Sequence, residues 1–389
     1  MTPINVLSLF DGMSCGQLAL QKANISVNTY FSSEVDKYAQ FVAQKNFPNT
    51  VFLGDITKIE SHTLPKIDLL IGGSPCQGFS FAGKMKGAVS KCNIEITSLN
   101  QYLDMKANGF EFEGQSYLFW EYIRLYKELK PTYFLLENVA MEQKWKNIIS
   151  KELGVNPLKN ADGKDGLNSA LVSAQNRVRL YWTNINAQPT GFFGHLEPNI
   201  PQPKDKNIYL KHVLETNVSD KYYLSEKMLT YVRKKTDINA TIDNIRKAKT
   251  LQVGGNSGGL HSQMELVVEP KVKQIGYINN KNAQANRVYD VSAKSVTLKG
   301  NAGGGGGKTG LYLYKAPCLH GFEHGSNGQF DKQLIKAGMI RRLTPIECER
   351  LQTLPDNYTQ GVSNTQRYRM IGNGWTVDMI AHIFYFLVF

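Results

Sequence analysis

Cys76 stands in the stretch IDLLIGGSPCQGFS, where an apolar run is followed by a glycine-rich loop. Pro75 fixes its own φ and donates no hydrogen bond, so the thiol is presented on a constrained loop just beyond a buried strand. A free cysteine is more often a buried small hydrophobic residue. The polar surroundings of Cys76 favour a nucleophile.

A carboxylate and two guanidinium groups follow in comparable positions. In the run YFLLENVA an apolar strand is expected to end with Glu137 and Asn138, and Glu137 either caps a helix or, in a closed pocket, carries a proton during a reaction. SAQNRVRLYW places Arg177 and Arg179 two apart on an expected strand, so both side chains point to one face. Two guanidiniums there suit planar recognition of an oxyanion or carbonyl, although a salt-bridged surface strand has the same pattern.

The first half of the chain alternates strand-like and helix-like segments. Strands are expected at 4–10, 26–36, 50–57, 66–76 and 132–139, and helices at 17–23, 37–47 and 117–130. This alternation predicts an α/β fold with a parallel sheet covered on both faces. Ligands bind such sheets where strands end, and Cys76 and Glu137 both lie at strand ends.

The turn DGMSCG, after the first strand, matches neither G-x-G-x-x-G nor the phosphate loop G-x-x-x-x-G-K-[ST]. Glu34 ends the second strand about 20 residues later, and this spacing suits a nucleoside whose ribose hydroxyls need an acceptor. A purely structural turn between strand and helix is the alternative.

Composition narrows the class of protein. The chain has 389 residues, of which 42% are hydrophobic and 20% charged, as in ordinary globular proteins. Its formal net charge is +12, and residues 190–340 hold 21 Lys and Arg against 12 Asp and Glu. This excess favours a polyanion partner for the later half, although a solvated surface would look the same.

Cysteine usage and hydropathy indicate a cytoplasmic protein. The five cysteines are odd in number and widely spread, which argues against a disulfide framework. The longest apolar run, IAHIFYFLVF, is too short to span a bilayer, so no membrane partner is expected.

The order of the motifs closely resembles that of the DNA cytosine-5 methyltransferases of bacteria and phages, which use S-adenosylmethionine. The resemblance covers residues 4–186 and 339–389 and rests on LSLFDGMSCG, SSEVD, GDIT, SPCQGFS, ENV, QNRVR, RRLTPIECERLQTLPDNY and YRMIGNGWTVDMIAHIF. It implies a doubly wound Rossmann-like methyltransferase sheet with a second, smaller target-recognition domain. The expected domains are an S-adenosylmethionine-binding and catalytic domain at 1–187, a target-recognition domain at 188–338, and a segment at 339–389 returning to the catalytic domain.

By this resemblance, Cys76 adds to C6 of a cytosine flipped out of duplex DNA. Glu137 contacts N3 and the exocyclic amine, Arg177 holds O2, and Arg179 supports the loop and the thiolate. C5 then takes the methyl group, and loss of the C5 proton releases Cys76. No metal is implied, because Cys318, His320 and His324 lack a further ligand pair.

The resemblance also assigns the S-adenosylmethionine site. Phe10 packs against adenine, Gly12 allows close backbone approach, and Glu34 binds the ribose. Asp55 and Ile56 meet the adenine edge. The remaining expected contacts are Met13, Ser14, Val35, Ser74, Leu118 and, around the methionine moiety, Asn373, Gly374 and Thr376.

One stretch is longer than the family's minimum, and another is rich in glycine. Residues 81–114 are longer than its catalytic loop, and we expect them to close over DNA as a lid. The glycine run at 303–307 suits a flexible linker or a close approach to phosphates.

The expected partner is double-stranded DNA, a cognate restriction endonuclease on the same site is a further candidate, and the enzyme is expected to be a monomer. One alternative is a tRNA cytosine-5 methyltransferase, although the recognition region of that branch is usually compact. The other is a catalytically inactive DNA-binding homologue, which would be expected to have lost Cys76 or the ENV segment.

Overall fold

The computed structural model describes residues 2–75, 89–90, 94–190, 195–222, 274–277, 287–291, 295, 311–313, 340–341 and 343–388. Cys76, most of the expected lid before residue 94, the glycine run at 303–307, and Cys318, His320 and His324 lie outside these residues.

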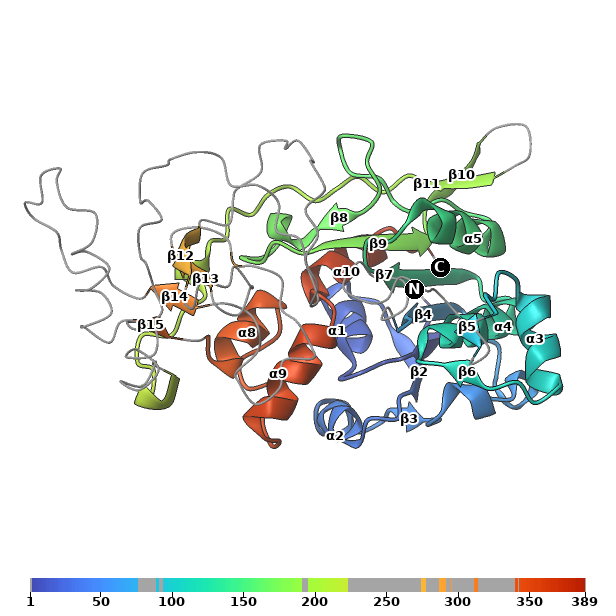
Figure 1. Cartoon of the computed structure of the whole chain (residues 1–389), viewed down its shortest axis with the longest axis horizontal. Coiled ribbons are helices and arrows are strands. Elements are labelled where there is room, and N and C mark those ends of the chain that lie inside the picture. The colour runs from blue at the N-terminus through green and yellow to red at the C-terminus, as the bar shows by residue number, and fades with distance from the viewer. Residues whose placement is uncertain are drawn as a thin grey trace, which may run out of the picture.

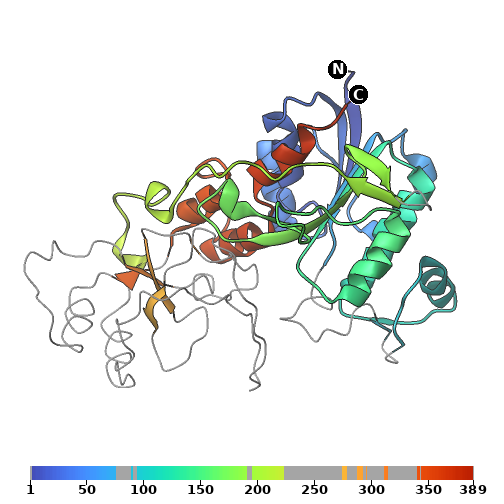
Figure 2. The ribbon, with the colours of Figure 1, turned by 90° about the horizontal axis from the view of Figure 1, so that it is seen from above.

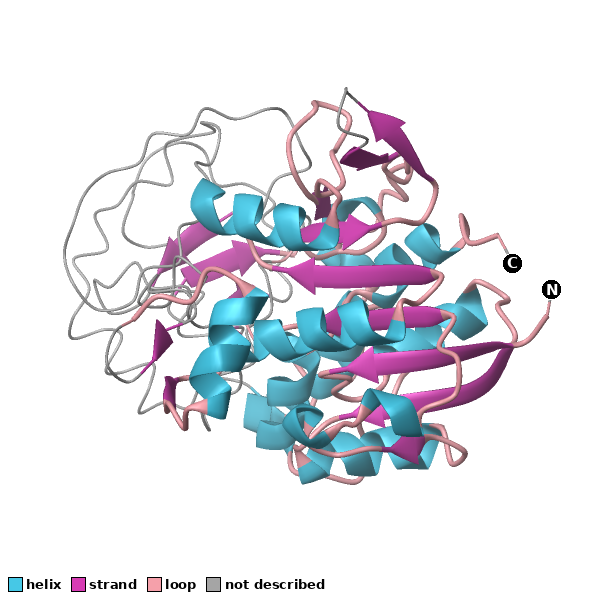
Figure 3. Ribbon diagram, turned by 90° about the vertical axis from the view of Figure 1, so that its right-hand side faces the viewer, coloured by secondary structure: helices cyan, strands magenta, loops and turns pink. Residues whose placement is uncertain are grey.

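A seven-stranded sheet forms the centre of the molecule (Figure 3). Its strand order is β3-β2-β1-β4-β7-β9-β8. The first five are parallel, and β9 runs antiparallel to both neighbours. This mixed sheet confirms the predicted α/β, Rossmann-like class. The strands are β1 (Ile4–Leu9), β2 (Val27–Ser33), β3 (Val51–Phe52), β4 (Leu69–Gly73), β7 (Tyr133–Asn138), β8 (Leu167–Asn168) and β9 (Val178–Thr183).

Helices cover both faces of this sheet because its strands are apolar on both sides. In β1, Ile4 and Val6 join one buried cluster, whereas Leu7 and Leu9 join another on the opposite face. The first cluster takes in α1 (Cys15–Lys22), α2 (Lys37–Asn46) and α10 (Val377–Phe384). The second takes in α3 (Leu99–Ala107), α4 (Phe119–Leu129) and α5 (Gln143–Leu153).

Shorter elements connect and extend this core. The 3-10 turns are η1 (Ile56–Lys58), η2 (Ser61–Thr63), η3 (Ser116–Leu118), η4 (Ser169–Leu171), η5 (Leu210–His212) and η6 (Asp220–Tyr222). Two two-stranded pairs are β5 (Val89–Ser90) with β6 (Phe112–Glu113), and β10 (Ala187–Thr190) with β11 (His195–Pro198).

A second, smaller sheet lies to one side of the large one (Figures 1 and 2). Its order is β12 (Gln274–Tyr277), β13 (Arg287–Asp290), β14 (Leu311–Leu313) and β15 (Ile340–Arg341). Three of these strands fall in the stretch expected to recognise the target. The domain limits at 187 and 338 stay predictions.

The C-terminal segment lies against the N-terminal one. After α8 (Pro345–Leu351) and α9 (Asn364–Asn373), helix α10 packs on α1. Asp378 of α10 accepts hydrogen bonds from Lys22 Nζ at 2.7 Å and Lys206 Nζ at 2.8 Å. Both chain ends therefore lie at the same side of the molecule (Figure 2).

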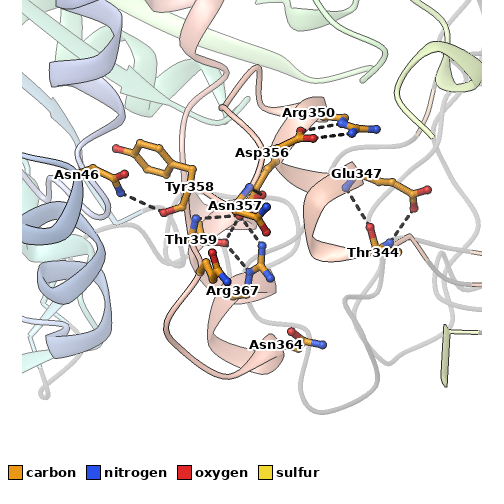
Figure 4. A network of polar contacts seen from close by, with 12 residues as sticks. Asn46, Thr344, Glu347, Arg350, Asp356, Asn357, Tyr358, Thr359, Asn364 and Arg367 are labelled. Atoms are coloured by element: carbon orange, nitrogen blue, oxygen red, sulfur yellow. Dashed lines mark hydrogen bonds and ion pairs between the residues drawn. The ribbon is translucent and has the colours of Figure 1, made fainter. Parts of the chain in front are cut away.

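A buried carboxylate organises residues 344–367, whose polar network is drawn in Figure 4. Glu349, whose side chain is fully buried, accepts hydrogen bonds from the Asn357 and Thr359 backbone N–H groups and lies 2.8 Å from Arg367 Nη2. The exposed pair of Arg350 and Asp356 lies beside it. The network therefore contains one buried and one exposed ion pair.

Glu349→Ala should lower the free energy of unfolding by about 3 kcal/mol, because it leaves the Arg367 guanidinium buried without its anion. Asp356→Ala should cost less than about 1 kcal/mol, because the lost pair is solvated. Urea denaturation followed by circular dichroism measures both variants. Equal losses would contradict this difference between the two pairs.

Candidate active site

The ends of β4 and β7 bring two predicted site segments together. Gly73 pairs with Glu137 in the parallel register of these strands. The Asn138 side-chain amide donates to Ser74 Oγ at 3.0 Å and ties the two strand ends. Ser74 is buried, and Pro75 is the last described residue before Cys76. The chain therefore enters the Cys76 loop directly beside Glu137.

Glu137 is buried and held on both carboxylate oxygens. Arg179 Nε lies 3.1 Å from Oε1, and Trp375 Nε1 donates to Oε2 at 3.2 Å. A buried anion needs such partners, because an unpaired charge out of water is costly. Arg179 and Trp375 also fix the direction in which the Glu137 carboxylate points at the sheet edge.

The two arginines have different partners. Arg177 precedes β9, which begins at Val178, and its guanidinium donates to the carbonyl oxygens of Gly372 at 3.3 Å and Gly374 at 3.0 Å. Only 3% of Arg177 is exposed. The guanidinium beside Glu137 is therefore that of Arg179, whereas Arg177 was expected to be the one nearer the substrate.

A buried amide network holds the turn that presents Trp375. Gln352 Nε2 donates to the carbonyl oxygens of Ile371 at 2.8 Å and Gly374 at 3.1 Å. Gln352 Oε1 accepts from the Thr376 hydroxyl at 2.8 Å and from Gln175 Nε2 at 3.2 Å. With Arg177, these residues pin the turn 372–376 to the start of β9.

The loop after β1 has an unusual backbone. Phe10, Gly12 and Ser14 all have positive φ, at 57°, 60° and 61°. Only Gly12 adopts that conformation without steric cost, and a Cβ built on Gly12 would meet no atom within 4 Å. The space above Gly12 is therefore open, as close approach of a ligand to the backbone requires.

Asp11 holds this loop from below, a role that the sequence did not reveal. It is buried and accepts hydrogen bonds from the hydroxyls of Ser14 at 2.5 Å, Tyr30 at 2.7 Å and Ser32 at 2.9 Å. Burial raises the pKa of Asp11, and the hydroxyl donors offset part of that rise. In the sequence, the only sign of this role was the position of Asp11 between Phe10 and Gly12, two predicted cofactor contacts.

Glu34 ties the loop after β2 to the loop after β1. Its carboxylate accepts from the backbone N–H groups of Gly12 at 2.9 Å, Val35 at 2.7 Å and Asp36 at 2.8 Å. Burial raises the pKa of Glu34 although these three bonds lower it. Val35 beside it is 69% exposed.

The loop after β3 joins the same edge. The Ser33 hydroxyl donates to the Gly54 carbonyl at 2.8 Å, so the ends of β2 and β3 are linked. Asp55 caps η1 by accepting from the Thr57 N–H at 2.9 Å, and Ile56 is buried behind it. Leu118 ends η3 and is partly buried against the same core cluster as Ile56.

Met13 faces the core rather than the sheet edge. Its side chain is 1% exposed, and its carbonyl accepts from the Tyr358 hydroxyl at 2.7 Å. A Cβ built on Gly374 would lie 2.7 Å from Met13 Cε, so the two segments are in close contact. Thr376 is also buried, whereas Asn373 is exposed. The predicted ligand contact of Met13 therefore does not involve its side chain.

Cys15, the first residue of α1, is not a second nucleophile. It is 3% exposed, and burial raises the pKa of its thiol to about 12. The thiolate, which is the reactive form, is then negligible at neutral pH.

The sequence also matches a known protein family and individual known proteins. A family model for C-5 cytosine-specific DNA methylases matches residues 4–388. The chain is 26% identical to the orphan methyltransferase M.SPRI of Bacillus phage SPR, with 99% of this chain and 97% of the phage protein covered. It is 25% identical to the type II methyltransferase M.HhaI of Haemophilus parahaemolyticus, with 99% and 94% covered.

Two solved structures share the fold. A DNMT2 mutant from Spodoptera frugiperda has a TM-score of 0.59 at 16% identity, covering 98% of this chain and 99% of that one. A putative DNA modification methyltransferase from an E. coli prophage has a TM-score of 0.52 at 17% identity, covering 98% of each. None of the helices in the described part of the chain has the length and apolar character needed to cross a membrane.

Arg177→Met should lower the free energy of unfolding by about 2 kcal/mol, because the buried carbonyls of Gly372 and Gly374 each lose a charged donor. Val178→Thr, at a neighbouring position that is 43% exposed, is the control and should change stability by less than about 0.5 kcal/mol. Chemical denaturation measures both. A loss at Arg177 no larger than that of the control would show that the turn is held without it.

Proposed function

The chain belongs to the C-5 cytosine-specific DNA methylase family, and on this premise we propose that it methylates C5 of a flipped cytosine in a specific short sequence of duplex DNA. The reaction runs through a covalent bond between Cys76 and C6, which makes the protein a DNA (cytosine-5-)-methyltransferase. S-adenosylmethionine, when bound, supplies the electrophilic methyl group.

One observation carries this proposal. The carboxylate of Glu137, fixed by Arg179 and Trp375, lies at the sheet edge where the chain leaves β4 toward Cys76. A nucleophile and a rigid acid or base are the two groups that addition to an unreactive aromatic ring requires. The pairing of β4, which leads to Cys76, with β7, which carries Glu137, supports this proposal.

In the proposed reaction, the Cys76 thiolate forms a bond to C6 of the cytosine ring. N3 takes up a proton as the electron density moves into the ring, and the Glu137 carboxylate accepts hydrogen bonds from the protonated N3 and from the exocyclic amine, which stabilises the protonated ring. C5 would then form its bond to the methyl carbon as the bond between that carbon and the sulfonium sulfur breaks, so that a neutral thioether leaves with the electron pair. A base removes the C5 proton, and the electron pair of that C–H bond restores the ring as the C6–S bond breaks.

Arg179, rather than Arg177, is proposed to face O2 of the cytosine. Its guanidinium already lies on Glu137, whereas that of Arg177 is committed to the carbonyls of Gly372 and Gly374. We therefore assign Arg177 to positioning the turn 372–376. The base itself must leave the duplex, because C5 and C6 are not accessible from within the stack.

The residues at the strand ends fit the proposed cofactor. Gly12 leaves open space above the backbone, and Glu34 provides a carboxylate at the end of β2. Phe10 follows β1, and Asp55 and Ile56 follow β3, at the same edge of the sheet. Ser14 binds Asp11 rather than facing that edge, so we assign it to shaping the loop.

Duplex DNA is the proposed partner, since the matching family model is one of DNA methylases and the relatives, covered over nearly their whole length, are named orphan and type II methyltransferases. A cognate restriction endonuclease is a further candidate because M.HhaI is named a type II enzyme. The tRNA alternative has the same chemistry and becomes an outcome of the experiment below.

Expression in a host that lacks cytosine-5 methylation should produce 5-methylcytosine within one short recurring DNA sequence, mapped by bisulfite sequencing. Cys76→Ser should abolish the signal, because its alcohol is not ionised at neutral pH. Parallel mapping of the host tRNA is the control for substrate class. Methylated tRNA with unmodified DNA would contradict the proposed substrate.

Glu34→Gln should weaken S-adenosylmethionine binding about tenfold, by loss of charged hydrogen bonds. In the unaltered protein the Kd should rise as the pH falls through the pKa of Glu34, which burial raises above its usual value, because the carboxylate then takes up a proton. The glutamine variant should lose that dependence. Isothermal titration calorimetry measures both, with Asp162→Asn, on an exposed loop, as the matched control. An unchanged pH dependence in Glu34→Gln would refute this role.

A further inference from the structure

A buried ionic cluster joins α3 to α4. Glu121, which is fully buried, accepts from the Tyr102 hydroxyl at 2.6 Å and from Lys106 Nζ at 2.5 Å. Its other oxygen lies 2.7 Å from Arg124 Nε. Burial would raise the pKa of Glu121, but the bonds from Lys106, Tyr102 and Arg124 together hold it below its usual value. Glu121 is therefore an anion around which both helices are fixed.

Arg124 connects Glu121 to the predicted adenine-binding segment. Its Nη2 donates to the carbonyl oxygens of Ile56 at 3.3 Å and Ile59 at 3.1 Å. These carbonyls belong to the turn that follows Asp55. A guanidinium can hold a carboxylate and two carbonyls together, because its donors form a rigid planar fork.

Tyr102 and Lys106, the cluster members from α3, lie in residues 81–114, the stretch that is longer than the family's usual loop. Helix α3 lies between β5 and β6, which pair antiparallel. Tyr102 also contacts the rings of Phe112 and Tyr117, with centroids 5.1 Å and 6.3 Å away. After β4 and Cys76, the chain therefore continues into the segment of β5, α3 and β6, which hydrogen bonds to Glu121 hold in place.

We propose that Arg124 is a positioning residue for S-adenosylmethionine, holding the Asp55–Ile59 turn in its binding conformation. Glu121, with Tyr102 and Lys106 of the inserted helix, keeps the guanidinium in place. This inference rests on the proposed use of that cofactor. It gives residues 94–114 a role in cofactor binding, in addition to the lid expected from the sequence.

The test uses the full chain and Arg124→Met, which keeps the aliphatic packing and removes every donor. The Kd for S-adenosylmethionine, measured by calorimetry without DNA, and the KM should both rise about tenfold, as expected for loosened backbone hydrogen bonds. The kcat at saturating cofactor should stay within about twofold, because Arg124 touches no reacting group. Arg124→Lys should give a smaller rise.

Two further variants sharpen the test. The double variant Tyr102→Phe with Lys106→Met should raise the Kd about threefold, since Glu121 then holds Arg124 less firmly. Arg350→Met is the matched control. Arg350 also bridges a carboxylate, of Asp356, and a carbonyl, of Val213, but it contacts none of the residues assigned to the cofactor. Its Kd should match that of the unaltered protein.

The outcomes separate a positioning role from a structural one. If Arg124→Met only lowers the thermal midpoint and binds S-adenosylmethionine normally, the inference is wrong. It is also wrong if kcat falls while the Kd stays constant. If the unaltered protein itself fails to bind S-adenosylmethionine, the proposed function fails first, and this inference with it.

Discussion

A carboxylate buried at the edge of a parallel sheet must keep its donors in place, because an unpaired charge there costs several kcal/mol. Glu137 meets this requirement with Arg179 from the adjacent strand and Trp375 from a position 238 residues later in the chain. The geometry of the candidate site thus depends on contacts that only the complete fold supplies. The C-terminal segment is part of the site because it delivers the second donor.

The same segment also shapes the loop after β1. Tyr358 holds the Met13 carbonyl, and Gly374 packs against the Met13 side chain. Gln352 and Arg177 meanwhile fix the turn that carries Trp375. One set of buried hydrogen bonds therefore sets the carboxylate and the proposed cofactor loop relative to each other. Buried polar networks of this kind specify a unique arrangement when every member is satisfied.

Much of the fold could be predicted because the signals are local. The alternation of apolar strands and helices predicted the succession of elements along the chain and a parallel sheet. The predicted strand ends located Glu34, Asp55 and Glu137. The roles of the two arginines could not be predicted this way. Their spacing could not reveal that Arg177 donates to the carbonyls of Gly372 and Gly374, which lie 195 and 197 residues later in the chain. The burial of Met13 likewise involves contacts with Tyr358 and Gly374, more than 300 residues later, which no local periodicity reveals. Cys76 lies outside the described residues, and its role stays a prediction.

The central claim is that Cys76 bonds covalently to a cytosine in DNA, and growth of the expressing host with 5-aza-2′-deoxycytidine tests it most directly. The ring nitrogen that replaces C5 carries no proton to lose, so the bond to sulfur cannot be released normally. Mass spectrometry of nuclease- and protease-treated genomic DNA should find the nucleotide on the peptide that contains Cys76. If the protein is abundant and folded in the treated cells but is recovered free of DNA, the account is contradicted.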